Sequence, residues 1–220
     1  MAPVRLRWLV ALSLAIALRS PPAFAFAHLW DFVEIFSNAD GSVQFVEMST
    51  VAPSETVLTA VVIRSLTSFQ AGEPDFHFSR NLAGSTANRR LLLATQGFAS
   101  SPGAVAPDFI LPDNFLEIGV DTLTLRSAGQ LTTVFDTLSW GPGLDRPLPS
   151  DGFLSLQRVG SGASLRFEAL PNTPTNFAGQ TGALVPEPAS AALVSLGLGV
   201  LAGLRRRRGL LAKQQRESES

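Results

Sequence analysis

Residues 29–48 read LWDFVEIFSNADGSVQFVEM, two short apolar runs on either side of a cluster of turn residues. The runs at 29–36 and 42–48 are rich in aromatic and branched side chains, which favour extended backbone. Between them stands SNADG, whose last residue, Gly41, can adopt the positive φ that a tight turn requires. This pattern predicts a β-hairpin.

The same alternation of short apolar runs and turn residues continues through the middle of the chain. Gly, Pro, Asn and Asp separate the runs, and no interior segment of the sequence has a long helical period. Frequent turns between short strands are typical of a β-sandwich or a barrel. Further strands are expected at residues 56–66, 90–95, 115–118, 122–126, 131–138, 153–157 and 164–170.

Several short motifs follow one another through this region. They are VEI at 33–35, FVEM at 45–48, RRLLLAT at 89–95, DTLSWG at 136–141, DGFLSLQR at 151–158 and TPTNF at 173–177. These motifs resemble those of bacterial relatives of the lamin tail domain, and the likeness covers residues 30–179. The resemblance implies an immunoglobulin-like antiparallel β-sandwich, which exported proteins use mostly as an accessory or adhesive module. We therefore expect one all-β domain over residues 28–170.

Residues 1–27 have the parts of a secretory signal peptide. Arg5 and Arg7 form a positive start, and an uncharged apolar run follows over residues 8–18. The pattern Ala-Phe-Ala, which suits signal peptidase, occurs at 23–25 and again at 25–27. We expect cleavage after Ala27, with Ala25 as the alternative site. The other interpretation is an uncleaved anchor, but the apolar run is shorter than the roughly 20 residues that span a bilayer.

A second targeting segment lies at the C-terminal end. Residues 171–184 are small and polar, which suggests a flexible spacer. Residues 189–204 are apolar and uncharged, and a helix of that length would measure about 24 Å. Four arginines follow, which the positive-inside rule keeps in the cytoplasm together with a polar tail at 210–220. The predicted membrane helix therefore leaves the acidic domain outside.

Residues 185–189, just before the apolar run, read VPEPA. This motif, the apolar run and the arginines, in this order, resemble the PEP-CTERM sorting domain of Gram-negative bacteria over residues 185–209. The resemblance implies recognition by an exosortase, a membrane-embedded cysteine peptidase, and release or transfer to the cell surface, often alongside exopolysaccharide production. A plain single-pass anchor is the alternative, because residues 210–220 extend beyond the point where such signals usually end. The resemblance implies that the exosortase recognises Pro186, Glu187 and Pro188. The topology of the membrane helix is expected to depend on Arg205, Arg206, Arg207 and Arg208.

The charge of the middle region excludes several classes of partner, and the absence of cysteine excludes several kinds of site. Residues 28–184 hold 15 acidic residues against 8 arginines and no lysine, a net charge of −7, although the whole chain carries −1. Such a surface repels nucleic acid and anionic lipid. The chain has no cysteine, which excludes thiol catalysis, cysteine-bound zinc and iron–sulfur clusters.

The first turn also bears comparison with a calcium-binding loop. If Gly41 takes the sixth position of such a loop, Asn38 and Asp40 fall on ligand positions and Glu47 falls on the twelfth. Phe36 would then occupy the first position, where an aspartate belongs. A hairpin explains the same residues without a metal, so we expect no cofactor.

Catalytic patterns are missing from the sequence. Neither a nucleophile elbow, a zinc-protease motif nor a phosphate-binding loop occurs, and the only histidines are His28 and His77. A pair of carboxylates could serve a glycosidase, but no spacing distinguishes one pair. Trp30 and Trp140 could present a sugar-binding surface or fill the core.

The sequence therefore predicts a non-enzymatic, exported protein that is held briefly in the inner membrane and then placed at the cell surface or outside the cell. Its expected partners are signal peptidase, exosortase, the inner membrane and exopolysaccharide. The first alternative is a carbohydrate- or calcium-binding adhesive module. The second alternative is a hydrolase that acts on polysaccharide.

Overall fold

The computed structural model describes residues 27–67, 75–144 and 146–184, which belong to one compact unit. The predicted leader up to residue 26, the recognition residues 186–188 and the predicted membrane helix at 189–204 lie outside these ranges. The described residues form strands and very little helix, so the expected all-β class is confirmed.

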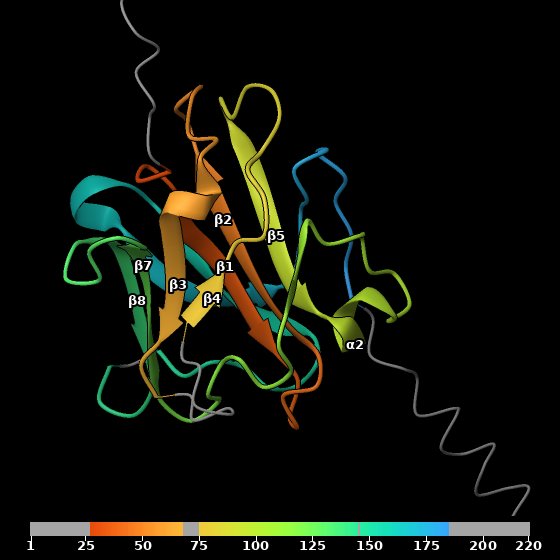
Figure 1. The fold of residues 1–220 in the computed structure, drawn as a ribbon. Helices are drawn as coiled ribbons and strands as arrows, with labels where there is room; N and C mark the ends of the chain where they lie inside the picture. Colours follow the sequence, from red (N-terminus) through yellow and green to blue (C-terminus); the bar gives the residue numbers. More distant parts are fainter. Residues whose placement is uncertain (1–26, 68–74, 145, 185–220) are drawn as a thin grey trace, which may run out of the picture. The chain divides into compact units, whose positions relative to one another are not determined.

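The strands form two sheets that enclose a core (Figure 1). One sheet has six strands in the order β10-β9-β1-β2-β5-β6, and the other has four in the order β4-β3-β7-β8. The first sheet comprises β1 (Asp31–Ser37), β2 (Gln44–Thr50), β5 (Arg89–Thr95), β6 (Phe109–Leu111), β9 (Leu154–Val159) and β10 (Arg166–Pro171). The second comprises β3 (Val61–Ser65), β4 (Asp75–His77), β7 (Asp121–Ser127) and β8 (Val134–Trp140). Short helices lie at η1 (Leu58–Ala60), α2 (Gln96–Ala99) and η3 (Gly162–Ser164).

The predicted hairpin is present as β1 and β2. The two strands pair antiparallel as far as Ser37 opposite Gln44, where the turn begins. Gly41 has a φ of +73°, and a Cβ added there would lie 2.1 Å from the side-chain oxygen of Asn114. Glycine is therefore required at this position both for its conformation and for the close approach of its neighbour.

Three features differ from the sequence-based expectation. Residues 115–118 do not form a strand, although Phe115 and Leu116 are buried; the side-chain amide of Gln44 binds the backbone N–H and C=O of Leu116, at 2.9 and 2.8 Å. The strands β4 and β6 were not predicted, because three residues are too few to show a period. The strand β6 also pairs parallel to β5, so the sandwich is not purely antiparallel.

Hydrophobic residues fill both faces of the six-stranded sheet. The inner face packs against the four-stranded sheet in the main core, which contains Trp30, Ile35, Val46 and Trp140. The outer face carries a smaller group, here called the second core, formed by Phe36, Phe45, Leu92, Ala94, Phe98 and Leu184. Because alternate residues of a strand face opposite sides, Glu34 and Glu47 share the outer face with Phe36 and Phe45.

One ionic contact joins the sheets along an edge. The carboxylate of Asp136 on β8 accepts a hydrogen bond from the backbone N–H of Phe32 on β1, at 2.7 Å. Arg158 on β9 binds the same carboxylate, with N–O distances of 3.0 and 3.1 Å. The guanidinium group also lies over the ring of Phe167. A side chain thus supplies the acceptor that a neighbouring strand would supply in a continuous sheet.

Candidate functional site

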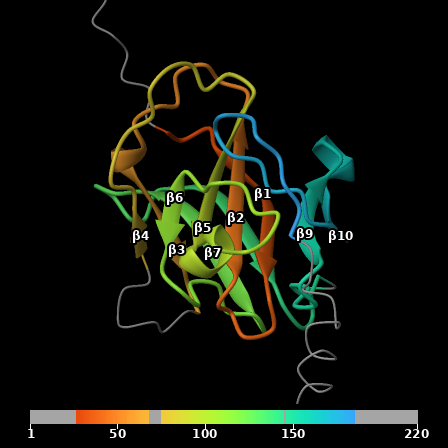
Figure 2. The same ribbon diagram turned by 90° about the vertical axis from the view of Figure 1, so that its right-hand side faces the viewer.

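Residues 172–184, here called the C-terminal loop, fold back onto the outer face of the six-stranded sheet. Figure 2 shows the loop in blue, in front of the sheet near β1 and β2. The loop contains a turn in which the N–H of Asn176 binds the carbonyl of Gln180, at 3.0 Å, and Thr175 bridges to Thr181. The Asn176 side chain also reaches the carbonyl of Ala106, at 3.0 Å. These residues therefore belong to the domain, and the structure differs from the flexible spacer that their composition suggested.

The two ends of the loop are tied together by Asn172 and Leu184, here called the exit clamp. The Asn172 side chain accepts from the N–H of Leu184 at 2.7 Å and donates to its carbonyl at 3.2 Å. The side-chain amide thus binds Leu184 as a paired strand would. Asn172 is 2 % exposed, and Leu184 is 5 % exposed within the second core. The last described residue is therefore held firmly against the domain.

Two buried carboxylates hold the start of the loop against the sheet. Glu34 on β1 accepts from the backbone N–H of Thr173 at 2.8 Å, from its hydroxyl at 3.0 Å and from the hydroxyl of Ser155 at 2.7 Å. Glu47 on β2 accepts from the backbone N–H of Thr175 at 2.5 Å and pairs with Arg90. The two glutamates occupy facing positions of the β1–β2 ladder. We call them the carboxylate pair.

Burial is the largest cause of the raised pKa of each glutamate in the carboxylate pair. Loss of water raises the pKa of Glu47 to about 7, although the charge of Arg90 and its hydrogen bond act in the opposite direction. The nearby charge of Glu34 adds to the rise. Burial likewise raises the pKa of Glu34, against the hydrogen bonds from Ser155 and Thr173. Both groups therefore bind protons more readily than exposed glutamates do.

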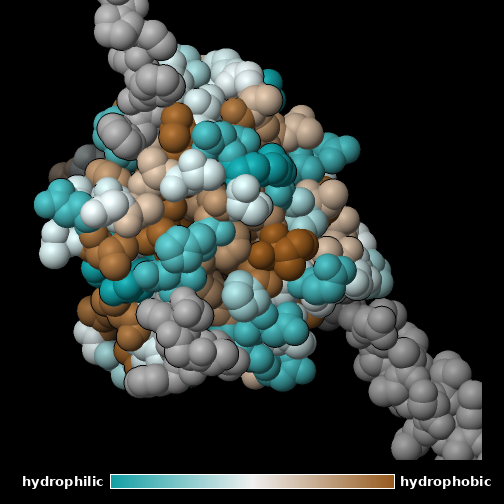
Figure 3. All heavy atoms as spheres, in the orientation of Figure 1, coloured by the Kyte–Doolittle hydropathy of each residue, from teal (hydrophilic) through white to brown (hydrophobic). Residues whose placement is uncertain are grey.

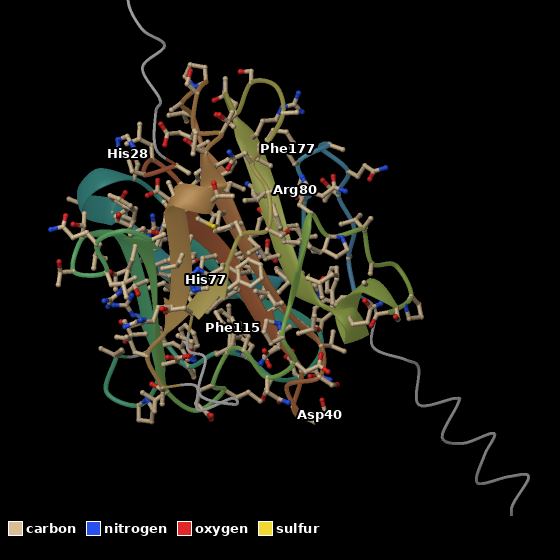
Figure 4. All side chains as sticks on the ribbon, viewed as in Figure 1. His28, Asp40, His77, Arg80, Phe115 and Phe177 are labelled. Atoms are coloured by element: carbon tan, nitrogen blue, oxygen red, sulfur yellow. The ribbon has the colours of Figure 1, made fainter. Side chains whose placement is uncertain are left out.

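A third carboxylate, that of Asp108, also accepts a hydrogen bond from a backbone N–H of the C-terminal loop. Asp108 accepts from the backbone N–H of Phe177 at 2.9 Å and from that of Leu92 at 2.8 Å. Its pKa is raised, again chiefly by burial. Figure 4 shows Phe177 and Arg80 near each other on this side of the domain. Acidic side chains thus serve here as acceptors for backbone N–H groups that no strand pairs.

The residues considered for calcium have separate partners in the structure. The carboxylate of Asp40 accepts from the N–H and the hydroxyl of Ser42, which lowers its pKa. Asn38 accepts from the N–H of Val43, and Glu47 belongs to the carboxylate pair. Asp40 lies at the tip of the hairpin (Figure 4). Among the described residues, no group of three or more acidic, histidine or cysteine side chains is arranged to hold a metal.

The two tryptophans considered for sugar binding are buried, and both histidines are exposed. Trp30 and Trp140 are 1 % and 0 % exposed, and their indole N–H groups bind the backbone carbonyls of Glu55 and Glu117, each at 2.9 Å. His28 lies 3.5 Å from a carboxylate oxygen of Glu55, whereas His77 is exposed on β4 (Figure 4). On the face shown in Figure 3, hydrophobic residues are dispersed among hydrophilic ones.

The two predicted cleavage residues differ in position. Ala27 is fully buried in the main core, whereas Ala25 lies outside the described residues. The arginines 205–208 and the recognition residues 186–188 also lie outside them. In the described part of the chain, no helix is long and apolar enough to cross a membrane.

Comparison with known proteins bears on the segment that starts at the exit clamp. Residues 184–208 match the PEP-CTERM protein-sorting motif. No curated protein and no solved structure matches the chain. Sequence reasoning located the motif, but it did not anticipate that the C-terminal loop packs against the sheet. The chain therefore carries a PEP-CTERM sorting motif, which indicates an exported protein that passes the membrane and is sorted by an exosortase.

Proposed function

We propose that this chain is an exosortase-processed protein of the cell surface or extracellular matrix, whose β-sandwich has a structural or adhesive role. The observation that carries the proposal is the sorting motif at residues 184–208, which begins at Leu184, a residue that Asn172 binds in the described part of the chain. In this view the domain is the cargo, and the motif determines where it is delivered.

The burial of the two carboxylates that face each other supports the proposal of a non-catalytic role. A glycosidase needs two carboxyl groups on either side of an open substrate site. Glu34 and Glu47 are 1 % and 0 % exposed, and the C-terminal loop covers them. Their hydrogen bonds go to the backbone of that loop. These contacts support a structural role for the pair.

The resemblance to lamin tail domains over residues 30–179 remains part of the proposal. An experimental structure of the domain tests it. An immunoglobulin-like strand connectivity would support the relationship, and an unrelated connectivity would remove it.

The sorting role is tested by changing Pro186, Glu187 and Pro188 to alanine in the full chain. An epitope tag at the exposed turn around Gly129 reports where the domain goes. In a host that carries an exosortase, we expect the unchanged protein to leave the membrane fraction in a shortened form. The triple-alanine variant should insert and remain full length, because the recognition residues are gone.

The control is the same pair of proteins in a host without the exosortase, where both should remain in the membrane. Removal of Arg205, Arg206, Arg207 and Arg208 should instead impair retention or orientation, since these charges set the topology. If the unchanged protein stays full length and membrane-bound in both hosts, the tail is an ordinary anchor and the proposal is wrong.

A further inference from the structure

We propose that the exit clamp restrains processing of this protein: Asn172 and Leu184 hold the chain so close to the sorting motif that the clamp must open before the exosortase can act. This inference rests on the proposed function. Asn172 is then a positioning residue. It acts through Leu184 on the exosortase reaction, which takes place further along the chain.

The backbone just before the motif is already occupied. Gly182 donates its N–H to the carbonyl of Pro174 at 3.0 Å, and Leu184 exchanges two hydrogen bonds with the Asn172 side chain. An extended peptide that binds to an enzyme or a sheet edge does so through its own backbone N–H and C=O groups. The N–H of Gly182 and the N–H and C=O of Leu184 are therefore not available to an enzyme while the clamp is closed.

Residues 182–184 are also packed closely against other parts of the domain. A Cβ added at Gly182 would lie 2.6 Å from the carbonyl oxygen of Gly103, and one added at Gly103 would lie 2.5 Å from that of Ala183. The two backbones are thus in direct contact, and Leu184 itself is buried among Phe36, Phe45 and Phe98. No peptidase can surround these residues without moving them.

Few residues separate the clamp from the recognition residues in the sequence. Pro186 is the second residue after Leu184 and Pro188 is the fourth, so the Cα atoms of Leu184 and Pro188 are at most about 14 Å apart. A membrane-embedded enzyme would have to bind the motif within that length of the folded domain. If residues 182–184 are released, the segment from residue 182 to residue 188 has seven residues and can span about 24 Å.

The contacts allow the end of the loop to open while its beginning stays in place. Asn172 is held independently, since its N–H and its side-chain amide both bind the carbonyl of Phe153, at 3.1 and 2.7 Å. Thr173 and Thr175 are bound by the carboxylate pair. Release of Leu184 therefore exposes part of the second core without breaking the sandwich.

The test compares processing rates of full-length proteins in the host that carries the exosortase. One variant has six Gly/Ser residues inserted between Leu184 and Val185, which lengthens the connection between the clamp and the recognition residues and leaves the clamp intact. A second variant, Asn172→Ala, opens the clamp. We expect both to be processed about fivefold or more faster than the unchanged protein in a pulse–chase experiment. The insertion should also leave the melting temperature of the domain unchanged. A faster reaction would then reflect better access of the exosortase to the motif and not a less stable domain.

Two matched controls accompany these variants. The same six residues inserted after Gly129, in an exposed turn with open space around it, should not change the rate. Asn176→Ala removes a similarly buried asparagine of the same loop, 4 % exposed, that does not contact Leu184. It should lower the melting temperature about as much as Asn172→Ala does, with less than a twofold effect on the processing rate.

The outcomes separate the inference from the proposed function. If the unchanged protein is processed and neither the insertion nor Asn172→Ala accelerates it, the clamp does not restrain the reaction, and the sorting function stands. Acceleration by Asn176→Ala equal to that of Asn172→Ala would also overturn the inference, because general loosening would then explain the effect. If no protein is processed in either host, the proposed function and this inference both fail.

Discussion

At the scale of single residues, the carboxylate pair shows how an acidic domain uses charge inside its own structure. Glu34 and Glu47 each accept backbone N–H groups of the C-terminal loop, which would otherwise be buried without partners. The loss of water raises both pKa values, so the hydrogen bonds are formed at an electrostatic cost. That cost depends on pH.

We expect Glu47→Gln to change the pH dependence of stability. The pKa of Glu47 is about 7 in the folded protein against an ordinary value of 4.5, so between these values the folded state binds the proton more tightly. The contribution of Glu47 to stability is therefore full below about pH 4.5 and falls as the pH rises to 7, by up to about 3 kcal/mol. The glutamine variant lacks this decline. Urea denaturation from pH 4.5 to 8 measures it.

The stability of the variant relative to the unchanged protein should thus rise across that range. Arg90 loses its partner in the variant, but its side chain is 46 % exposed and stays solvated. The control is Asp113→Asn, which removes an exposed carboxylate. Parallel stability curves for Glu47→Gln and the unchanged protein would show that Glu47 titrates as an exposed group does.

Gly41→Ala tests the turn of the hairpin. An alanine at a φ of +73° is strained, and its Cβ would collide with the side chain of Asn114. We expect a loss of about 2 kcal/mol in the free energy of unfolding. Gly152→Ala is the control, because its φ is +79° but nothing lies within 4 Å of the added Cβ. Equal losses for the two variants would mean that the contact with Asn114 adds nothing.

At the scale of elements, the C-terminal loop behaves as an additional layer on the six-stranded sheet. It has no strand longer than an isolated bridge, yet it buries Asn172, Asn176 and Leu184. Its backbone groups find side-chain partners on β1, β2 and the segment before β6. The loop is thus held by many separate hydrogen bonds rather than by one ladder.

Removing the loop should therefore destabilise the domain. We compare chains that end at residue 184 and at residue 171. The shorter chain exposes Phe36 and Phe45 and leaves the carboxylate pair without its backbone donors. A loss of at least about 3 kcal/mol is expected from the apolar burial and the hydrogen bonds together. Calorimetry should show a melting temperature roughly 6–12 °C lower. Equal melting temperatures would restore the interpretation of these residues as a spacer.

At the scale of the whole molecule, the start of the domain bears on how the leader is removed. The sequence favoured cleavage after Ala27, but the Ala27 side chain is fully buried in the main core. A chain cut after Ala25 keeps this contact, and one cut after Ala27 loses it. We therefore expect Phe26 to be the first residue of the exported protein. Its intact mass decides the question, and a chain that begins at His28 would contradict us.

Local signals in the sequence determined the class of fold and the position of the sorting motif. The hairpin at β1 and β2 follows from two β-rich runs around SNADG, and the motif at residues 184–208 follows from the order of its parts. Both patterns act over short distances, since a turn or a linear recognition segment needs only its own neighbouring residues. For the same reason, the expected strands at 90–95 and 122–126 coincide closely with β5 and β7.

Only the tertiary structure decided how distant segments complete one another. Residues 173 and 34 are far apart in the sequence, and nothing in the small, polar loop indicates that its N–H groups meet buried glutamates. The sequence FLEI at 115–118 predicts a strand, but a single glutamine supplies the partner that a strand would have supplied. Side chains that replace backbone partners leave no periodic signal, because their contacts depend on the folded arrangement of the sheets and not on spacing along the chain.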